Sequence, residues 1–279
     1  MYRKVFIDKY LKQGFDFDEA RSEVDFALDA LFNYSYKDFM LGKVLEKWQL
    51  VKIDRVFEER VLTHKPIQQI IGQAFFYKRK FFVNENTLIP RPETELLVEK
   101  VLNLSKDYEN PKVLDIGTGT GCIPISLVLE NSKITAESVD ISANAIEIAQ
   151  KNALFHNVYN KVKFIKSDLF ENVSDEYNII VSNPPYIPLN DKDTLQIEFR
   201  DFDPPLALFT SDEDGIEFYE KIIEDAKNHL LINGYLIFEL GINQSQLVKN
   251  LFEENGYSDI EIIKDYNSID RIIFAKRKY

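Results

Sequence analysis

The segment NIIVSNPPYIP (178–188) ends an apolar run with Asn183, Pro184, Pro185 and Tyr186, a combination that could act on a weakly nucleophilic nitrogen. In an amide or an exocyclic amine the nitrogen lone pair is delocalised into a neighbouring π system. In a backbone amide this conjugation gives a rotation barrier of about 18–20 kcal/mol. Two acceptors that hold both N–H bonds can turn the lone pair out of conjugation, toward an electrophilic methyl group.

The tetrapeptide supplies two such acceptors, the side-chain oxygen of Asn183 and the backbone carbonyl of Pro184. The prolines add no competing N–H donor and fix the local backbone, while Tyr186 offers a flat face to a planar amide or base. Two prolines could also simply terminate a strand, but that interpretation leaves the flanking Asn and Tyr unexplained. We expect Asn183, Pro184 and Tyr186 to be catalytic, with Pro185 beside them at the substrate.

A glycine-rich turn in VLDIGTGTGCIPISL (113–127) is typical of a site for a nucleotide-like ligand. The turn consists of Gly117, Thr118, Gly119, Thr120 and Gly121. Glycine permits positive φ and a close approach of the backbone to a ligand, and the helix that follows presents free N–H groups. Taken alone, the pattern is a weak signal and is more often only a tight turn.

Acidic residues at strand ends strengthen the ligand interpretation. Asp115 lies in the strand before the glycine turn, and Asp140 ends the next strand, where a carboxylate can accept both hydroxyls of a ribose. Asp140 could also cap the helix that starts at Ser142, and both roles are compatible. At the end of the third strand, Asp168 could bind an adenine amino group with Leu169 against the ring, or cap a helix. Together with the tetrapeptide, these residues favour S-adenosylmethionine and methyl transfer over a nicotinamide dinucleotide.

The elements that position these residues form an α/β pattern from Pro111 onward. Apolar strands are predicted at 112–117, 134–140, 162–168, 178–185 and 234–241, alternating with helices near 122–130, 142–155 and 216–230. Such alternation predicts a parallel sheet with helices on both faces, so that the strand ends meet at one edge. Segments 258–266 and 270–278 are predicted to add an antiparallel hairpin at the edge of the sheet.

The preceding part of the chain has helical spacing. Apolar residues recur at three and four in Phe26–Leu31, in the group Phe39, Met40, Val44 and Leu45, and in Val56–Val61, with Asp16 or Asp18 and Ser35 as N-caps. Segment 75–83 is predicted to be a β-hairpin around a Lys78-Arg79-Lys80 turn, and Glu93–Leu104 a helix after Pro90 and Pro92. We therefore expect a helical domain (1–72), a hairpin linker (73–86) and a catalytic domain (87–279).

Composition narrows the class of protein. The net charge of -12 is uneven, because residues 1–85 hold 15 Lys and Arg against 13 Asp and Glu, which leaves 19 against 33 for the remainder. This balance counts against a nucleic-acid substrate. The single cysteine, Cys122, excludes an internal disulfide, and the three histidines lack metal-ligand spacing. No long apolar stretch or secretory signal is present, so we expect a cytoplasmic protein without metal.

The chain resembles the HemK/PrmC family of release-factor glutamine N5-methyltransferases over essentially its full length. The matching parts are KPIQQIIGQAFFYKRKFFVNENTLIPRPETELLVE (65–99), VLDIGTGTGCIPISL (113–127), VSNPPYIP (181–188) and KDYNSIDRIIFAKR (264–277). The glycine turn is shared by all class I methyltransferases, and NPPY also by DNA adenine methyltransferases. The first of the four segments is far more specific.

The resemblance implies a class I methyltransferase fold with a mostly parallel seven-stranded sheet and a small N-terminal helical bundle joined by a β-hairpin. It implies methylation of the glutamine in the GGQ motif of peptide-chain release factors by S-adenosylmethionine. We also expect a cytoplasmic monomer that binds neither nucleic acid nor membrane. Residues from Gly117 to Gly121, with Asp140, Asp168, Leu169 and Asn183, would bind cofactor. Residues from Asn183 to Tyr186, with Arg91 and Glu93, would bind substrate. Leu169 departs from the aromatic residue that many members carry.

Two alternatives remain. The same Asn183 and Tyr186 could serve an N6-adenine methyltransferase acting on a flipped base of DNA or RNA. That activity needs a basic recognition surface, which neither the near-neutral first 85 residues nor the acidic remainder supplies. A non-catalytic binding protein of the same fold is disfavoured by the intact glycine and NPPY motifs.

Overall fold

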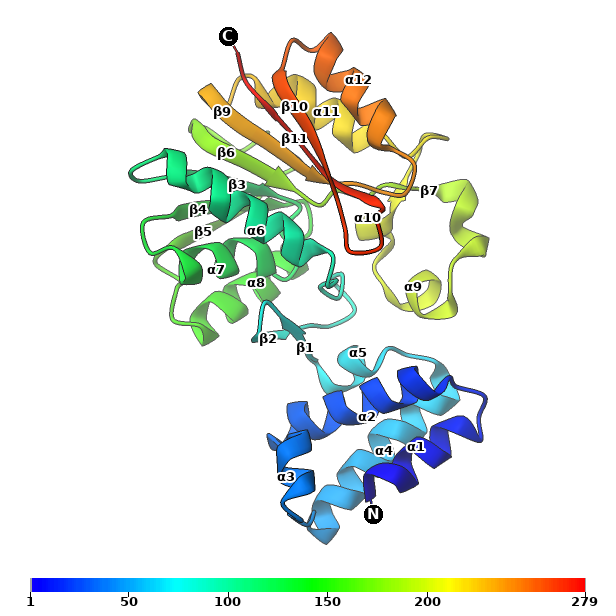
Figure 1. Cartoon of the computed structure of the whole chain (residues 1–279). Coiled ribbons are helices and arrows are strands. Elements are labelled where there is room, and N and C mark those ends of the chain that lie inside the picture. The colour runs from blue at the N-terminus through cyan, green and yellow to red at the C-terminus, as the bar shows by residue number, and fades with distance from the viewer. Residues whose placement is uncertain (1, 279) are drawn as a thin grey trace. The chain divides into compact units, whose positions relative to one another are not determined.

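The computed structural model describes residues 2–278 (Figure 1). Contacts between Cα atoms divide the chain into two compact units. The first runs to Ala74 and also takes in Gln196–Phe202, and the second comprises Phe75–Leu195 and the chain from Asp203 onward. Within the described residues, no helix is both long enough and apolar enough to cross a membrane.

The first unit is a set of helices around its own apolar core. Its helices are α1 (Tyr2–Leu11), α2 (Phe17–Phe32), α3 (Tyr36–Met40), α4 (Lys47–Thr63), α5 (Ile67–Ile71) and α9 (Ile197–Phe202). Val24 of α2, Phe57 of α4 and Ile67 of α5 are buried in one cluster. Asp16 caps α2 and Ser35 caps α3 through their side-chain oxygens, as the sequence predicted.

Two features of this unit differ from the prediction. Helix α1 was not predicted, because its apolar residues are interrupted by charges and show no continuous stripe. Helix α3 ends at Met40, so Val44 and Leu45 lie outside any helix, which corrects the second predicted helix. Leu45 is nevertheless buried in the core cluster. Leu45 is therefore buried from an irregular segment, whereas Met40 and Val44 of the same spacing are exposed.

Arg60 is the buried charge of the first unit, with 2% of its surface exposed. Its Nε donates to Glu23 at 2.9 Å, and its Nη2 donates to Glu19 at 3.0 Å and to Glu198 at 3.1 Å. Glu198 belongs to α9, so this network ties the returning segment Gln196–Phe202 to the helices of the first unit. The sequence pattern did not predict that return.

The hairpin formed by β1 (Gln73–Phe76) and β2 (Arg79–Phe82) turns one residue earlier than predicted. Tyr77 and Lys78 have φ of 48° and 60°, and positive φ at both positions is what a two-residue type I′ turn requires. The predicted Lys78-Arg79-Lys80 turn is thus wrong, because Arg79 and Lys80 belong to β2.

From Phe75 onward, the hairpin belongs to the second unit. Phe76 and Phe81 are buried in one of its core clusters. The Asn152 side chain accepts a hydrogen bond from the Phe82 backbone N–H at 2.7 Å and donates one to the Phe82 carbonyl at 3.0 Å. An asparagine amide therefore continues the hydrogen bonding of β2 onto helix α8 (Ala143–Phe155).

The second unit is built on a seven-stranded sheet of order β10-β11-β9-β6-β3-β4-β5. Its strands are β3 (Lys112–Ile116), β4 (Thr135–Asp140), β5 (Val162–Lys166), β6 (Tyr177–Ser182), β9 (Leu230–Glu239), β10 (Ser258–Lys264) and β11 (Asp270–Lys276). The neighbours from β9 through β5 are parallel, whereas β11 is antiparallel to β9 and to β10. This is the predicted mostly parallel sheet with an antiparallel hairpin at one edge.

Helices cover both faces of the sheet (Figure 1). They are α6 (Thr94–Leu104), α7 (Cys122–Glu130) and α8 on one face, and α11 (Glu217–Ala226) and α12 (Ser245–Glu254) on the other. Short elements complete the unit: η1 (Ser105–Asp107), η2 (Leu189–Thr194), α10 (Pro205–Leu208), β7 (Ile187–Pro188) and β8 (Phe209–Thr210). The fold thus brings the ends of β3, β4, β5 and β6 together at one edge.

Candidate active site

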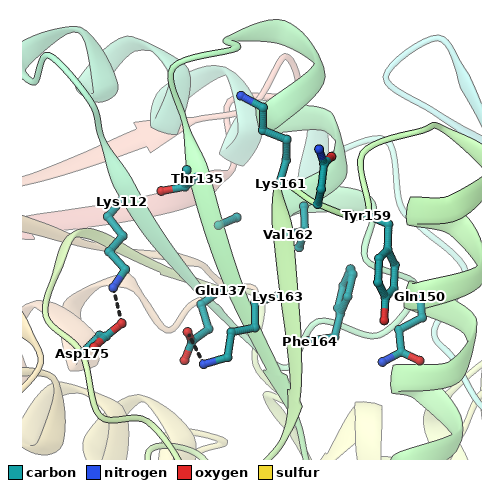
Figure 2. Close-up of a pocket in the computed structure, with 12 residues that line it drawn as sticks. Lys112, Thr135, Glu137, Gln150, Tyr159, Lys161, Val162, Lys163, Phe164 and Asp175 are labelled. Atoms are coloured by element: carbon teal, nitrogen blue, oxygen red, sulfur yellow. Dashed lines mark hydrogen bonds and ion pairs between the residues drawn. The ribbon is translucent and has the colours of Figure 1, made fainter.

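Among the hollows formed by described residues of the second unit, two that have the size of a ligand site lie at opposite ends of the strands. One, of about 460 Å³, is lined by the first residues of β3, β4 and β5 (Figure 2). Four of its five charged residues form ion pairs, Lys112 with Asp175 and Lys163 with Glu137 at 3.0 Å, while Lys161 donates to the Ser132 carbonyl. Ligands of open parallel sheets bind beyond the carboxyl ends of the strands. This hollow lies at the amino ends, so it is not the candidate ligand site.

The other cavity, of about 370 Å³, lies at the carboxyl ends of the strands. Among the residues lining it are eight of those singled out from the sequence: Gly117, Gly119, Asp140, Asp168, Leu169, Asn183, Pro184 and Pro185. The lining does not include Thr118, Thr120, Gly121, Tyr186, Arg91 or Glu93. The structure therefore brings the glycine turn, the two acidic strand ends and three residues of the tetrapeptide to one cavity.

The glycines of the turn play two different roles. Gly117 and Gly119 have φ of 75° and 53°, and a Cβ at either position would meet no atom within 4 Å, so their backbone lies open. Gly121 has φ of 76°, and a Cβ there would lie 3.1 Å from the side chains of Ala149 and Ile125. The first two glycines admit a ligand, whereas Gly121 lets α7 approach α8 closely.

Asp140 holds the glycine turn in place. Its Oδ2 accepts a hydrogen bond from the Gly119 N–H and its Oδ1 one from the Ser142 N–H, both at 2.9 Å. Ser142, not Asp140, is the N-cap of α8. Burial raises the pKa of Asp140, and the two backbone donors lower it in part. Each carboxylate oxygen keeps a lone pair that can accept a ribose hydroxyl.

Asp115 was noted in the sequence but not counted among the site residues. It is fully buried at the end of β3, and neither carboxylate oxygen has a hydrogen-bond partner within residues 2–278. Burial raises the pKa of Asp115 to about 7, and the negative charge of Asp140 adds to this rise. The nearby Thr118 hydroxyl lowers the pKa in part, although it makes no hydrogen bond to the Asp115 carboxylate. Asp115 does not line the cavity, so its carboxylate can favour a cationic ligand only through its charge, not by contact.

The turn after β5 places Asp168 and Leu169 at the cavity. Asp168 is exposed, and residues 168–172 form turns, so no helix begins there for Asp168 to cap. Leu169 has φ of 44°, and Ser167 holds this turn by donating to the Leu169 carbonyl at 3.0 Å. An aromatic residue that the sequence reasoning missed, Phe218, also lines the cavity from α11. The helical spacing of 216–230 gave no reason to single it out.

Asn183 is half-buried at the cavity and is held by a short chain of side chains. Its Nδ2 donates to Thr94 Oγ1 at 3.3 Å, and Thr94 Oγ1 donates to Glu239 Oε2 at 2.6 Å. Within residues 2–278 no hydrogen bond is made to Asn183 Oδ1 or to the Pro184 carbonyl oxygen. Two adjacent acceptors of the tetrapeptide are thus free for a ligand.

Tyr186 packs behind the cavity. Its carbonyl accepts a hydrogen bond from Gln244 Nε2 at 2.9 Å, and a Cβ on Gly241 would come within 2.8 Å of its ring. Burial raises the pKa of Tyr186 to about 12, so the phenol stays protonated near neutrality. The ring is therefore a fixed surface and not a base.

Arg91 and Glu93 lie on the approach to α6, away from the cavity lining. Arg91 Nη2 donates to Asp203 Oδ2 at 2.5 Å. Burial raises the pKa of Asp203 to about 6, which the Arg91 guanidinium partly opposes. Pro204, next to Asp203, lines the cavity. The ion pair therefore fixes part of the cavity rim.

Comparisons with known proteins agree with this geometry. Residues 92–199 match the family model of the methyltransferase small domain. The release factor glutamine methyltransferase of Flavobacterium psychrophilum is 37% identical, covering 98% of this chain and 96% of that protein. The corresponding protein of Streptococcus pneumoniae is 38% identical over 96% and 94% of the two chains.

A longer relative and a solved structure extend the comparison. The bifunctional methyltransferase of Rickettsia bellii is 36% identical over 96% of this chain, which spans 54% of that protein's length. The structure of a methyltransferase from Pyrococcus furiosus covers 80% of this chain and 98% of its own, with a TM-score of 0.55 and 18% identity. That likeness shows the class I methyltransferase fold, predicted from the sequence. Because it covers nearly the whole length of the Flavobacterium and Streptococcus proteins, and they cover nearly all of it, the chain belongs to the release factor glutamine methyltransferase family.

Proposed function

We propose that this protein transfers a methyl group from S-adenosylmethionine to the side-chain amide nitrogen of the glutamine in the GGQ motif of peptide-chain release factors. The observation that carries the proposal is the cavity in which the open glycine turn and Asp140 lie together with the free acceptors of Asn183 and Pro184. The names of the relatives identify the amide as a glutamine of a release factor.

The residues at the first part of the cavity fit the cofactor. Gly117 and Gly119 have open backbone at the cavity, and Asp140 has lone pairs left for hydroxyls. Asp115 does not line the cavity, but its buried carboxylate, without a partner among the described residues, adds negative charge next to the glycine turn. We assign adenine to Asp168 and Leu169. When bound, S-adenosylmethionine supplies an electrophilic methyl group on a sulfonium sulfur.

The tetrapeptide would act on the nitrogen without a charged base. Asn183 Oδ1 and the Pro184 carbonyl accept the two N–H bonds, so that the lone pair faces the methyl group. The nitrogen gains one methyl group and then releases one of its two protons to water, so no charged base is needed for the transfer itself. Orientation of this kind can be worth about 7–11 kcal/mol, and each preorganised polar contact about 2.7–4 kcal/mol. Tyr186, whose pKa is about 12, stays neutral behind the cavity and supports the two acceptors from there.

The proposal is tested by mixing the purified protein with methyl-labelled S-adenosylmethionine, a release factor and a DNA duplex. We expect label on the release factor and none on the duplex. A release factor whose GGQ glutamine is replaced by alanine is the matched control and should remain unlabelled. Label on DNA alone would instead support the N6-adenine reaction that the same tetrapeptide could perform.

Cellular context follows from the substrate. We propose that the protein works in the cytoplasm, where release factors act, as a monomer that contacts protein rather than nucleic acid or membrane. The acidic charge of residues 86–279 supports this choice, since it opposes a phosphate backbone. Light scattering during size exclusion measures the oligomeric state. Fluorescence anisotropy of a labelled duplex at physiological salt measures binding to nucleic acid.

A further inference from the structure

The orientation of the Asn183 amide depends on two buried residues outside the tetrapeptide. Thr94, the first residue of α6, and Glu239, the last residue of β9, are 3% and 2% exposed. Their side chains form the chain Asn183 Nδ2 to Thr94 Oγ1 to Glu239 Oε2, with distances of 3.3 and 2.6 Å. Neither Thr94 nor Glu239 lines the cavity.

The direction of each hydrogen bond in this chain follows from chemistry. A carboxylate has no proton and can only accept, so Glu239 takes the single hydroxyl hydrogen of Thr94. Thr94 Oγ1 then has only lone pairs to offer and must accept from its other neighbour. That neighbour is the Asn183 amide, which therefore turns its NH₂ group toward Thr94. Its carbonyl oxygen is left for a ligand.

This direction matters because the two ends of an asparagine amide are opposite in function. With Oδ1 available, Asn183 accepts an N–H bond of the substrate amide. With the Asn183 amide reversed, the N–H bonds of its Nδ2 would point at the N–H bonds of the substrate amide. The substrate nitrogen would then lose one of its two acceptors. Asparagine alone has no means of choosing between these two states, which are nearly equal in shape.

We propose that Thr94 and Glu239 are positioning residues that hold the Asn183 amide with Oδ1 toward the substrate. The inference rests on the proposed function, since it explains how one of the two acceptors of that reaction is set. Thr94 and Glu239 act through Asn183 and touch neither the cofactor nor the reacting atoms.

The buried surroundings of Glu239 are consistent with the proposed positioning role. Burial raises the pKa of Glu239 to about 7, and the Thr94 hydrogen bond and the Arg271 charge lower it in part. The titratable and charged groups that face Glu239 are Arg91, Glu93, Cys122, Tyr186, Tyr219 and Arg271. Arg91 pairs with Asp203, and Arg271 pairs with Asp265. The Glu239 carboxylate accepts a hydrogen bond from Thr94.

The test compares Thr94→Val with Thr94→Ser in the full-length protein at about pH 8, where Glu239 is mostly ionised. Valine fills the same space but has no oxygen, whereas serine keeps the hydroxyl and loses only a methyl group. Thr135→Val makes the same chemical change at an exposed position at the start of β4 and serves as the matched control. Transfer to the release factor is measured at saturating cofactor, and cofactor affinity by calorimetry.

We expect Thr94→Val to lower kcat by about ten- to hundredfold, while Thr94→Ser and Thr135→Val stay near the wild type. Cofactor affinity should change by less than about threefold in all three. Thr94→Val with unchanged kcat, or Thr94→Ser as impaired as Thr94→Val, would overturn the inference. Absence of transfer by the wild-type protein would instead overturn the proposed function, so the two failures are distinguishable. Melting temperatures of the variants show whether each is folded.

Discussion

At the scale of single residues, the site is defined by free hydrogen-bond acceptors. Asn183 Oδ1 and the Pro184 carbonyl carry no hydrogen bond within residues 2–278, although both residues lie in a packed part of the fold. Free acceptors beside a glycine turn suit a substrate whose reactive atom is a poor nucleophile with two N–H bonds. This chemistry needs orientation more than proton transfer.

Replacing Asn183 by alanine tests the acceptor directly. Loss of one preorganised contact of about 2.7–4 kcal/mol should lower kcat by about 10²–10³-fold. Cofactor binding should survive in large part, because Asp115, Gly117 and Asp140 are untouched. Asn250→Ala on α12 is the control, since Asn250 is exposed and does not line the cavity. Undiminished turnover of Asn183→Ala would refute the acceptor role.

Glu239 allows a prediction about stability and pH. Its pKa is raised from 4.5 to about 7, so its contribution to stability is full below about pH 4.5 and is lost as pH rises through 7. Glutamine does not titrate, so the variant Glu239→Gln does not lose this contribution. Its stability minus that of the wild type should therefore be larger at about pH 8 than at about pH 5, by at most about 3 kcal/mol. Urea unfolding at both pH values measures this difference. The exposed Glu224→Gln should show none, and an equal difference at both pH values for Glu239→Gln would contradict the assignment.

At the scale of elements, the ends of strands decide where the chemistry lies. The segment after β6 is fixed from behind by Gln244, whose Nε2 donates to the carbonyls of Tyr186 and Asp214 at 2.9 Å. Gly241 gives this amide room, because a Cβ there would lie 2.3 Å from Gln244 Oε1 and 2.8 Å from the Tyr186 ring. The loop after β9 therefore supports the loop after β6.

Gly241→Ala should displace Tyr186 and reduce both stability and transfer. Overpacking of this kind typically costs about 1–3 kcal/mol. Gly256→Ala is the comparison, because Gly256 has φ of 76° but nothing within 4 Å of a Cβ, so its cost is confined to backbone strain. We expect Gly256→Ala to lower stability while kcat stays near the wild type. Equal kcat for the two variants in urea-free assays would show that Gly241 does not support the site.

The sheet and most of the cavity were predictable because they depend on local pattern. Apolar runs mark β3, β4, β6 and β9, and parallel strands place their carboxyl ends at one edge, which locates Asp140, Asp168 and Asn183. The support of Asn183 was not predictable, since Thr94 and Glu239 are distant in sequence and their contact depends on how α6 packs on β9. The same holds for Glu198, whose pairing with Arg60 no local spacing indicates.

At the scale of the whole molecule, the chain is divided between a helical unit and a sheet unit, and the division is not sequential. Gln196–Phe202 groups with the helices although the residues on both sides of it group with the sheet. Arg60 is the centre of that arrangement, since its guanidinium binds three carboxylates. Burial raises the pKa of Glu23, and the Arg60 charge offsets part of that rise.

Arg60→Ala should therefore destabilise the helical unit in particular. Removing one partner of a buried ion pair typically costs about 3–5 kcal/mol, because the remaining charges are left unpaired. Arg55→Ala, an exposed arginine of the same helix, should change stability by less than about 0.5 kcal/mol. Hydrogen exchange should localise the loss to α2, α4 and α9. Unchanged exchange in those helices would contradict the structural role of Arg60.

The central claim, that the cavity holds a glutamine amide of a release factor, is tested most directly by locating the methyl group. The protein is incubated with S-adenosylmethionine and an unmodified release factor, and the product is digested and sequenced by tandem mass spectrometry. The account predicts a single methyl group on the side-chain nitrogen of the GGQ glutamine, absent with the Asn183→Ala variant. A methyl group on any other residue, or an unmodified release factor beside a methylated duplex, would contradict it.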